Sequence, residues 1–142
     1  MIQINRAILL PTLILTLLAM GACGKKDEAP AGKVFFSEPQ DGAEIKSPVK
    51  IVMGLDGMKI QPAGEVVEGT GHHHLLINKG PIAAGQVIPT DDDHKHFGKG
   101  QTEAELELAP GDYKLTLQFA DGLHRSYGEN LSATINIKVA AN

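Results

Sequence analysis

The heptapeptide Gly71-His72-His73-His74-Leu75-Leu76-Ile77 places three consecutive histidines at the head of an apolar run. A short apolar run bounded by glycine and polar residues is typical of a buried β-strand. Successive side chains of a strand point to opposite faces, so His72 and His74 share one face while His73 lies on the other with Leu75 and Ile77. The stretch therefore predicts a strand with a pair of histidines on one face and an apolar row on the other.

Alternating or apolar runs recur on both sides of this strand, at Val34–Ser37, Val49–Met53, Thr102–Leu108, Tyr113–Phe119 and Ala133–Val139. Turn signals separate the runs, and no convincing helical period appears after the N-terminal segment. We expect a further short strand at Glu65–Val67 and a long surface loop over residues 79–100. Tyr113 follows a Pro-Gly turn in the manner of a tyrosine corner. The pattern predicts an all-β, immunoglobulin-like antiparallel β-sandwich of six to eight short strands over residues 34–142.

The N-terminal segment has the layout of an export signal. A short basic lead and an apolar run end at Met20-Gly21-Ala22-Cys23, which resembles a bacterial lipobox around the chain's only cysteine. The run is too short for a membrane-spanning helix, and Pro11 weakens that alternative. We therefore expect a lipoprotein signal peptide (1–22), lipidation of Cys23 and a flexible lipidated tether (23–33). This predicts anchoring to a membrane on the periplasmic side of the cell envelope, with the outer membrane favoured.

Charge and composition narrow the classes of partner. The chain has 142 residues and a formal net charge of −4 at pH 7. It lacks a basic stripe interleaved with aromatic residues, so no nucleic-acid partner is expected. No cysteine remains after Cys23 to form a disulfide, so the single domain must derive its stability from an apolar core. The sequence identifies no protein partner.

Histidines supply the most concentrated chemistry of the chain. Residues two apart on a strand lie roughly 6.5–7 Å apart, so the rings of His72 and His74 can lean onto one ion. His94 and His96 repeat this spacing within the predicted loop, and His124 is isolated. Nitrogen donors without thiolates suit Cu(II) or Zn(II). We therefore predict a copper or zinc site with five candidate ligands: His72, His74, His94, His96 and His124.

Two other interpretations remain open at this stage. The histidines could form a metal-free hydrogen-bond network in an envelope interaction or scaffold module, and His73 is expected to be a hydrogen-bonded core residue. A metal-dependent enzyme would need an open coordination position, which sequence does not reveal, and a binding role is preferred. Asp93 is a candidate to orient a histidine or to have a structural role. The trio Asp121, His124 and Ser126 has the residue types of a hydrolase triad, but its close spacing gives no reason to expect the relay.

Three motifs together resemble one family. They are Gly71–Ile77, His96–Glu103 and Leu117–Gly128, and they look like the bacterial domain of unknown function 4399. The resemblance implies a small exported protein of unestablished biochemical role. Its motif positions here are His72, His73, His74, His94, His96 and His124, and their presence supports a convergent site. Asp112-Tyr113 is less typical of the family. Separately, the opening from Glu38 to Pro48 resembles the first hairpin of exported copper-binding sandwiches, which bears on the fold alone.

Overall fold

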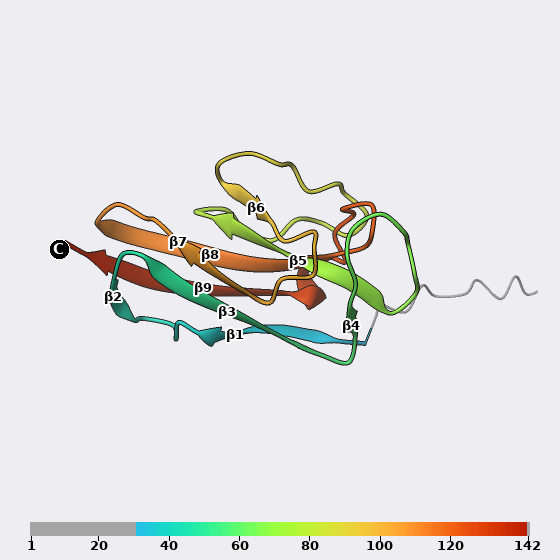
Figure 1. The fold of residues 1–142 in the computed structure, drawn as a ribbon, viewed down its shortest axis with the longest axis horizontal. Coiled ribbons are helices and arrows are strands. Elements are labelled where there is room, and N and C mark those ends of the chain that lie inside the picture. Colours follow the sequence, from blue (N-terminus) through green and yellow to red (C-terminus); the bar gives the residue numbers. More distant parts are fainter. Residues whose placement is uncertain (1–30, 142) are drawn as a thin grey trace, which may run out of the picture.

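The computed structural model describes residues 31–141, which fold into nine strands in two sheets (Figure 1). The predicted all-β sandwich is confirmed. The predicted signal peptide (1–22) and Cys23 lie outside the described residues, as does most of the tether. Within residues 31–141 no helix is both long and apolar enough to cross a membrane. The strands are β1 (Lys33–Glu38), β2 (Glu44–Lys46), β3 (Val49–Asp56), β4 (Lys59–Ile60), β5 (Thr70–Ile77), β6 (His94–His96), β7 (Glu103–Leu106), β8 (Gly111–Ala120) and β9 (Ser132–Ala140).

The triple-histidine strand β5 lies inside the larger sheet. The smaller sheet has the order β1-β3-β7, and the larger has the order β2-β9-β8-β5-β4 with β6 also paired to β5. Strand β8 pairs antiparallel with β5 from His72 to Ile77 and holds its backbone along that length. On its other side, β5 pairs with β4 near its start and with β6 further along. Of the described pairs, only β2–β9 and β4–β5 are parallel, and both are short.

The apolar core fills the space between the two sheets. Leu75 and Ile77 of β5 contribute to it, together with Leu115, Leu117 and Phe119 of β8 and with Ile51 of β3. The tyrosine corner is present, because the Tyr113 hydroxyl donates to the backbone oxygen of Ala109 at 2.9 Å. This packing fixes which face of β5 looks inward. His72 and His74 therefore lie on the outer face of the larger sheet.

A layer of loops covers that outer face. The long connection between β5 and β6 lies on the side of the larger sheet away from β1 and β3 (Figure 1). Ile88 of this connection is 2% exposed, and Leu76 beneath the layer is fully buried. The backbone N–H of Ile88 donates to the His124 carbonyl at 2.9 Å, and that of Ser126 donates to Gln86 at 2.8 Å. The connection thus holds the His124 segment over the sheet.

Local expectations differ from the structure in three places. Glu65–Val67 forms no strand. The short strand of this region is β4, which begins six residues nearer β3 because Lys59 and Ile60 pair with Thr70 and Gly71. The predicted loop 79–100 contains β6, whose three residues gain backbone partners in β5. Strand β2 was not expected. Three-residue strands carry too little alternation to be recognised before their partner is known.

Candidate metal centre

Two buried histidines form the floor of the candidate site. The side chains of His72 and His74 are both 0% exposed, on the outer face of β5. Their Nε2 atoms lie 3.0 Å apart, and their ring centroids lie 4.8 Å apart. The spacing of two residues on one strand face produces this approach, as the sequence predicts. Because β8 pairs with β5 at both positions, the two rings stand on a braced backbone.

His96 joins this pair from the neighbouring strand. In the β5–β6 ladder His96 lies directly opposite His74. Its ring centroid is 5.0 Å from that of His74 and 5.1 Å from that of His72. Gly98 makes this placement possible, because a Cβ atom at that position would overlap the imidazole of His96. The ring therefore folds over backbone that only glycine leaves open.

His124 reaches the same place from the turn between β8 and β9. Its Nε2 atom lies 3.1 Å from that of His96, and its ring centroid is 5.1 Å from that of His72. The backbone of His124 has a φ of 64°, in the left-handed region that few residues other than glycine adopt. Sequence reasoning placed His124 among the candidates but gave no sign of this strained turn.

The structure does not bring His94 into the cluster. His94 lies opposite Leu76 in the β5–β6 ladder, two residues from His96 and on the side away from His72. Its Nδ1 atom contacts the carboxylate of Asp91 at 2.7 Å. The carboxylate that orients a histidine is thus that of Asp91, whereas Asp93 forms an ion pair with Lys79 at 3.4 Å.

His73 occupies the opposite, core-facing side of β5. It is 1% exposed, and its ring lies edge-on to Phe119 with centroids 5.2 Å apart. The burial of His73 agrees with expectation. The predicted hydrogen bonds do not form: neither ring nitrogen has a partner in the described chain. The apolar surroundings of the sandwich core offer no acceptor. Burial, with a smaller contribution from His72, lowers the pKa of His73 to about 4.

Burial and mutual repulsion keep three of the clustered imidazoles neutral. Burial lowers the pKa of His72 to about 4, helped by His96 and His124 and opposed by Asp121. Burial and the neighbouring histidines lower the pKa of His74 to about 2. The pKa of His96 is also lowered, by burial and then by His124. These three rings are therefore uncharged at neutral pH, the form in which imidazole binds metals.

The nitrogen spacing suits a metal ion. Donors placed about 2.0–2.1 Å from one ion lie about 2.9 Å apart at a right angle and about 3.4 Å apart at the tetrahedral angle. The Nε2 pairs of His72 with His74 and of His96 with His124 are 3.0 and 3.1 Å apart. One ligand atom each from His72, His74 and His96 lies within 4.8 Å of the others. The arrangement can hold a metal through the three imidazoles of His72, His74 and His96.

The hydrolase-type trio is engaged in other contacts. The Asp121 carboxylate accepts hydrogen bonds from the backbone of Leu123 and from the backbone and side chain of Arg125. The Ser126 hydroxyl donates to the Ile82 carbonyl at 2.8 Å. His124 faces His96 instead of either residue. No relay from aspartate through histidine to serine is formed.

Comparison with known proteins identifies a family. A family described as a domain of unknown function (DUF4399) matches residues 51–140. This range includes all six histidines of the chain and the strands that position the cluster. No curated protein and no solved structure matches the chain.

Proposed function

The chain belongs to the DUF4399 family, and we propose that its domain binds one Cu(II) or Zn(II) ion through the Nε2 atoms of four histidines. These are His72, His74, His96 and His124. The observation that carries the proposal is the pair of Nε2 separations, 3.0 and 3.1 Å, in rings that come from three separate segments. His94, the fifth candidate from the sequence, is left out because its ring contacts Asp91.

The donor set determines the class of metal. Imidazole donors suit Zn(II) and Cu(II), whereas thiolates or thioethers favour Cu(I) and iron–sulfur clusters. The single cysteine lies at position 23, before the domain. Met53 is 3% exposed in the core, and Met58 packs against the same core. Sulfur ligation is therefore not supported, and a nitrogen-bound divalent ion is.

The facing ring nitrogens of His72 and His74 favour a metal over a purely structural network. The facing Nε2 atoms of His72 and His74 can share one hydrogen bond, but the Nδ1 atoms of both rings are buried without a partner in the described chain. Each such buried polar atom costs on the order of 1–3 kcal/mol. Coordination through Nε2 leaves these Nδ1 atoms without a partner as well, so they do not distinguish the two accounts. The facing Nε2 atoms do, because a shared hydrogen bond uses only one of the two as an acceptor, whereas an ion binds both lone pairs.

Exposure suggests how an ion reaches the site. His72 and His74 are fully buried, His124 is half-buried and His96 is exposed. An ion would therefore enter past His96 and His124 and settle on the buried pair. Four protein donors fill a tetrahedral site and leave no position for a substrate, which supports a carrier or buffer over a catalyst.

The cellular place of this module is also a proposal. The Met20-Gly21-Ala22-Cys23 motif supports lipidation at Cys23, and the polar residues that follow support a tether. We propose that the domain stands on the periplasmic side of the envelope, held by its acyl chains, with the outer membrane favoured. Incorporation of labelled palmitate, and its loss in Cys23→Ala, tests this part separately from metal binding.

Thermal unfolding tests metal binding itself. Domain without a polyhistidine tag, stripped by a chelator, should melt at a higher temperature with Cu(II) or Zn(II). Ligand at about 100 times Kd stabilises a folded state by about 2.7 kcal/mol. The double variant His72→Ala/His74→Ala should lose the whole shift. A wild-type protein that shows no shift, or a double variant that retains it, would leave the structural network as the better account.

A further inference from the structure

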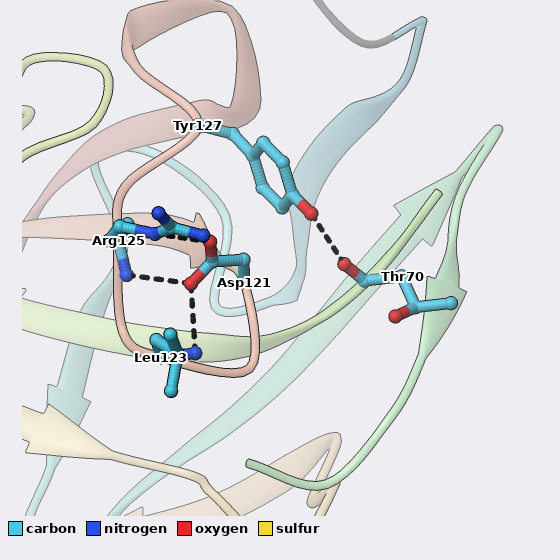
Figure 2. Close-up of polar contacts among 5 residues, drawn as sticks. All are labelled: Thr70, Asp121, Leu123, Arg125 and Tyr127. Atoms are coloured by element: carbon cyan, nitrogen blue, oxygen red, sulfur yellow. Dashed lines mark hydrogen bonds and ion pairs between the residues drawn. The ribbon is translucent and has the colours of Figure 1, made fainter. Parts of the chain in front are cut away.

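The turn that carries His124 is organised around one buried carboxylate (Figure 2). Asp121 is 6% exposed. Its Oδ1 atom accepts from the backbone N–H groups of Leu123 at 2.9 Å and Arg125 at 3.0 Å. Its Oδ2 atom accepts from the Arg125 Nε at 2.8 Å. The three bonds bracket His124 on both sides without involving its ring.

The main chain of Asp121 closes the same turn. The His124 N–H donates to the Asp121 carbonyl at 2.9 Å, and the Asp121 N–H donates to the Arg125 carbonyl at 3.0 Å. His124 sits at a φ of 64° within this turn. The left-handed conformation costs a non-glycine residue roughly 1–2 kcal/mol. The bonds to Asp121 offset this cost and hold the residue in a conformation it would otherwise leave.

Further contacts set the turn over the buried histidines. The Tyr127 hydroxyl donates to the Thr70 carbonyl at 2.7 Å, joining the end of the turn to β5 two residues before His72 (Figure 2). Gly122 packs so closely on the backbone of Glu65 that a Cβ atom would overlap it. The turn is thus held at its end, at its start and internally. Its position fixes where the His124 ring points.

We propose that Asp121 is a positioning residue that presents His124 as the fourth nitrogen donor of the site. It acts through the turn and makes no contact with the ion. The inference rests on the proposed function, because it assigns a role within the same metal centre. The relevant variants are Asp121→Ala, which removes both carboxylate oxygens, and Asp121→Asn, which keeps an Oδ1 acceptor for the two backbone N–H groups.

Nitrogen counting by electron paramagnetic resonance on Cu(II)-loaded protein is the primary measurement. We expect four imidazole nitrogens in the wild type and three in both Asp121→Ala and His124→Ala, with Cu(II) affinity lowered by about 10–100-fold. Asp121→Asn should restore the four-nitrogen spectrum. Asp92→Ala, which changes an exposed loop aspartate, should match the wild type.

A double variant separates positioning from general destabilisation. If Asp121 acts through His124, Asp121→Ala/His124→Ala should bind Cu(II) no more weakly than His124→Ala alone. Additive losses in the double variant would overturn the proposal, as would a four-nitrogen spectrum in Asp121→Ala.

The metal-free protein provides a reading that does not depend on the proposed function. Nuclear magnetic resonance couplings of His124 report its φ, and we expect the positive value to be lost in Asp121→Ala and kept in Asp121→Asn. If wild-type protein binds no Cu(II), the proposed function fails and this measurement alone decides the role of Asp121 in the turn. A positive φ at His124 in Asp121→Ala would then overturn the inference.

Discussion

The Nε2 atom of His124 lies 3.1 Å from the Nε2 atom of His96, although 28 residues separate the two histidines in sequence. His96 comes from a short strand at the side of β5, and His124 comes from a turn after β8. Both meet a second close pair, His72 and His74, on the outer face of the larger sheet. The site therefore depends on three segments that only the tertiary fold brings together.

The two histidines of β6 form a matched pair for mutagenesis. His96→Ala should abolish most of the metal-dependent rise in melting temperature, because it removes a donor next to the buried pair. His94→Ala should leave that rise intact, because the His94 ring contacts Asp91. Thermal unfolding with and without Zn(II) measures both variants. Equal losses in the two variants would place His94 in the site after all.

Gly98 tests the geometry without removing any ligand. In Gly98→Ala the new methyl group would overlap the His96 ring and must displace it. We expect metal affinity to fall by at least about 10-fold, as for loss of ligand orientation in other metal sites. Gly80→Ala is the control, because a Cβ atom there meets nothing within 4 Å and the backbone needs no positive φ. Titration with Zn(II) compares the two, and unchanged affinity in Gly98→Ala would show that His96 is not confined as described.

Much of this arrangement follows from the sequence, but not all of it. Alternation within the strand explains why His72 and His74 share a face and why His73 is turned inward. The two-residue spacing of His94 and His96 does not show which of them joins the cluster. That distinction depends on the pairing of β6 with β5, which places His96 opposite His74. The strained turn at His124 depends on hydrogen bonds that the Asp121 carboxylate accepts, which the sequence pattern does not predict. Long-range pairing decides the first of these details, and side-chain hydrogen bonding within the turn decides the second.

The buried His73 side chain should lower the stability of the domain. Both of its ring nitrogens are buried without partners, and an apolar replacement removes that cost. His73→Leu should therefore raise the free energy of unfolding at pH 7 by about 1–3 kcal/mol. Metal binding should be unaffected, since the ring lies on the opposite face of β5 from the site. Denaturant unfolding decides the matter, and a marked loss of stability would mean that the ring has partners this structure does not contain.

Acid should destabilise the metal-free protein through the same residue. The pKa of His73 falls from 6.5 to about 4 on folding, chiefly through burial. The unfolded chain then binds more protons than the folded one between these values, so stability is complete above pH 6.5 and is lost as the pH falls toward 4. Protonation of His73 across this window lowers the free energy of unfolding by roughly 3 kcal/mol in total. His73→Leu should show a shallower decline in unfolding measurements across this window, and an identical decline would contradict the assignment.

Metal binding should resist moderate acid. Protons compete only where they bind the free ligands, and the pKa values of His72 and His74 are lowered to about 4 and about 2. The metal-dependent rise in melting temperature should therefore persist at about pH 5.5, below the range in which ordinary imidazoles become protonated. Scans in a pH series provide the check. A loss of the rise centred near pH 6.5 would show that the buried pair does not govern the competition between protons and the metal.

Copper coordination in the whole domain tests the central proposal most directly. Domain without a tag, loaded with one equivalent of Cu(II), should give an electron paramagnetic resonance spectrum of one ion per chain ligated by imidazole nitrogens. The same preparation of His72→Ala/His74→Ala should give only the spectrum of loosely bound or free copper. An unchanged spectrum in the double variant, or no specific copper in the wild type, would contradict a metal centre built on β5.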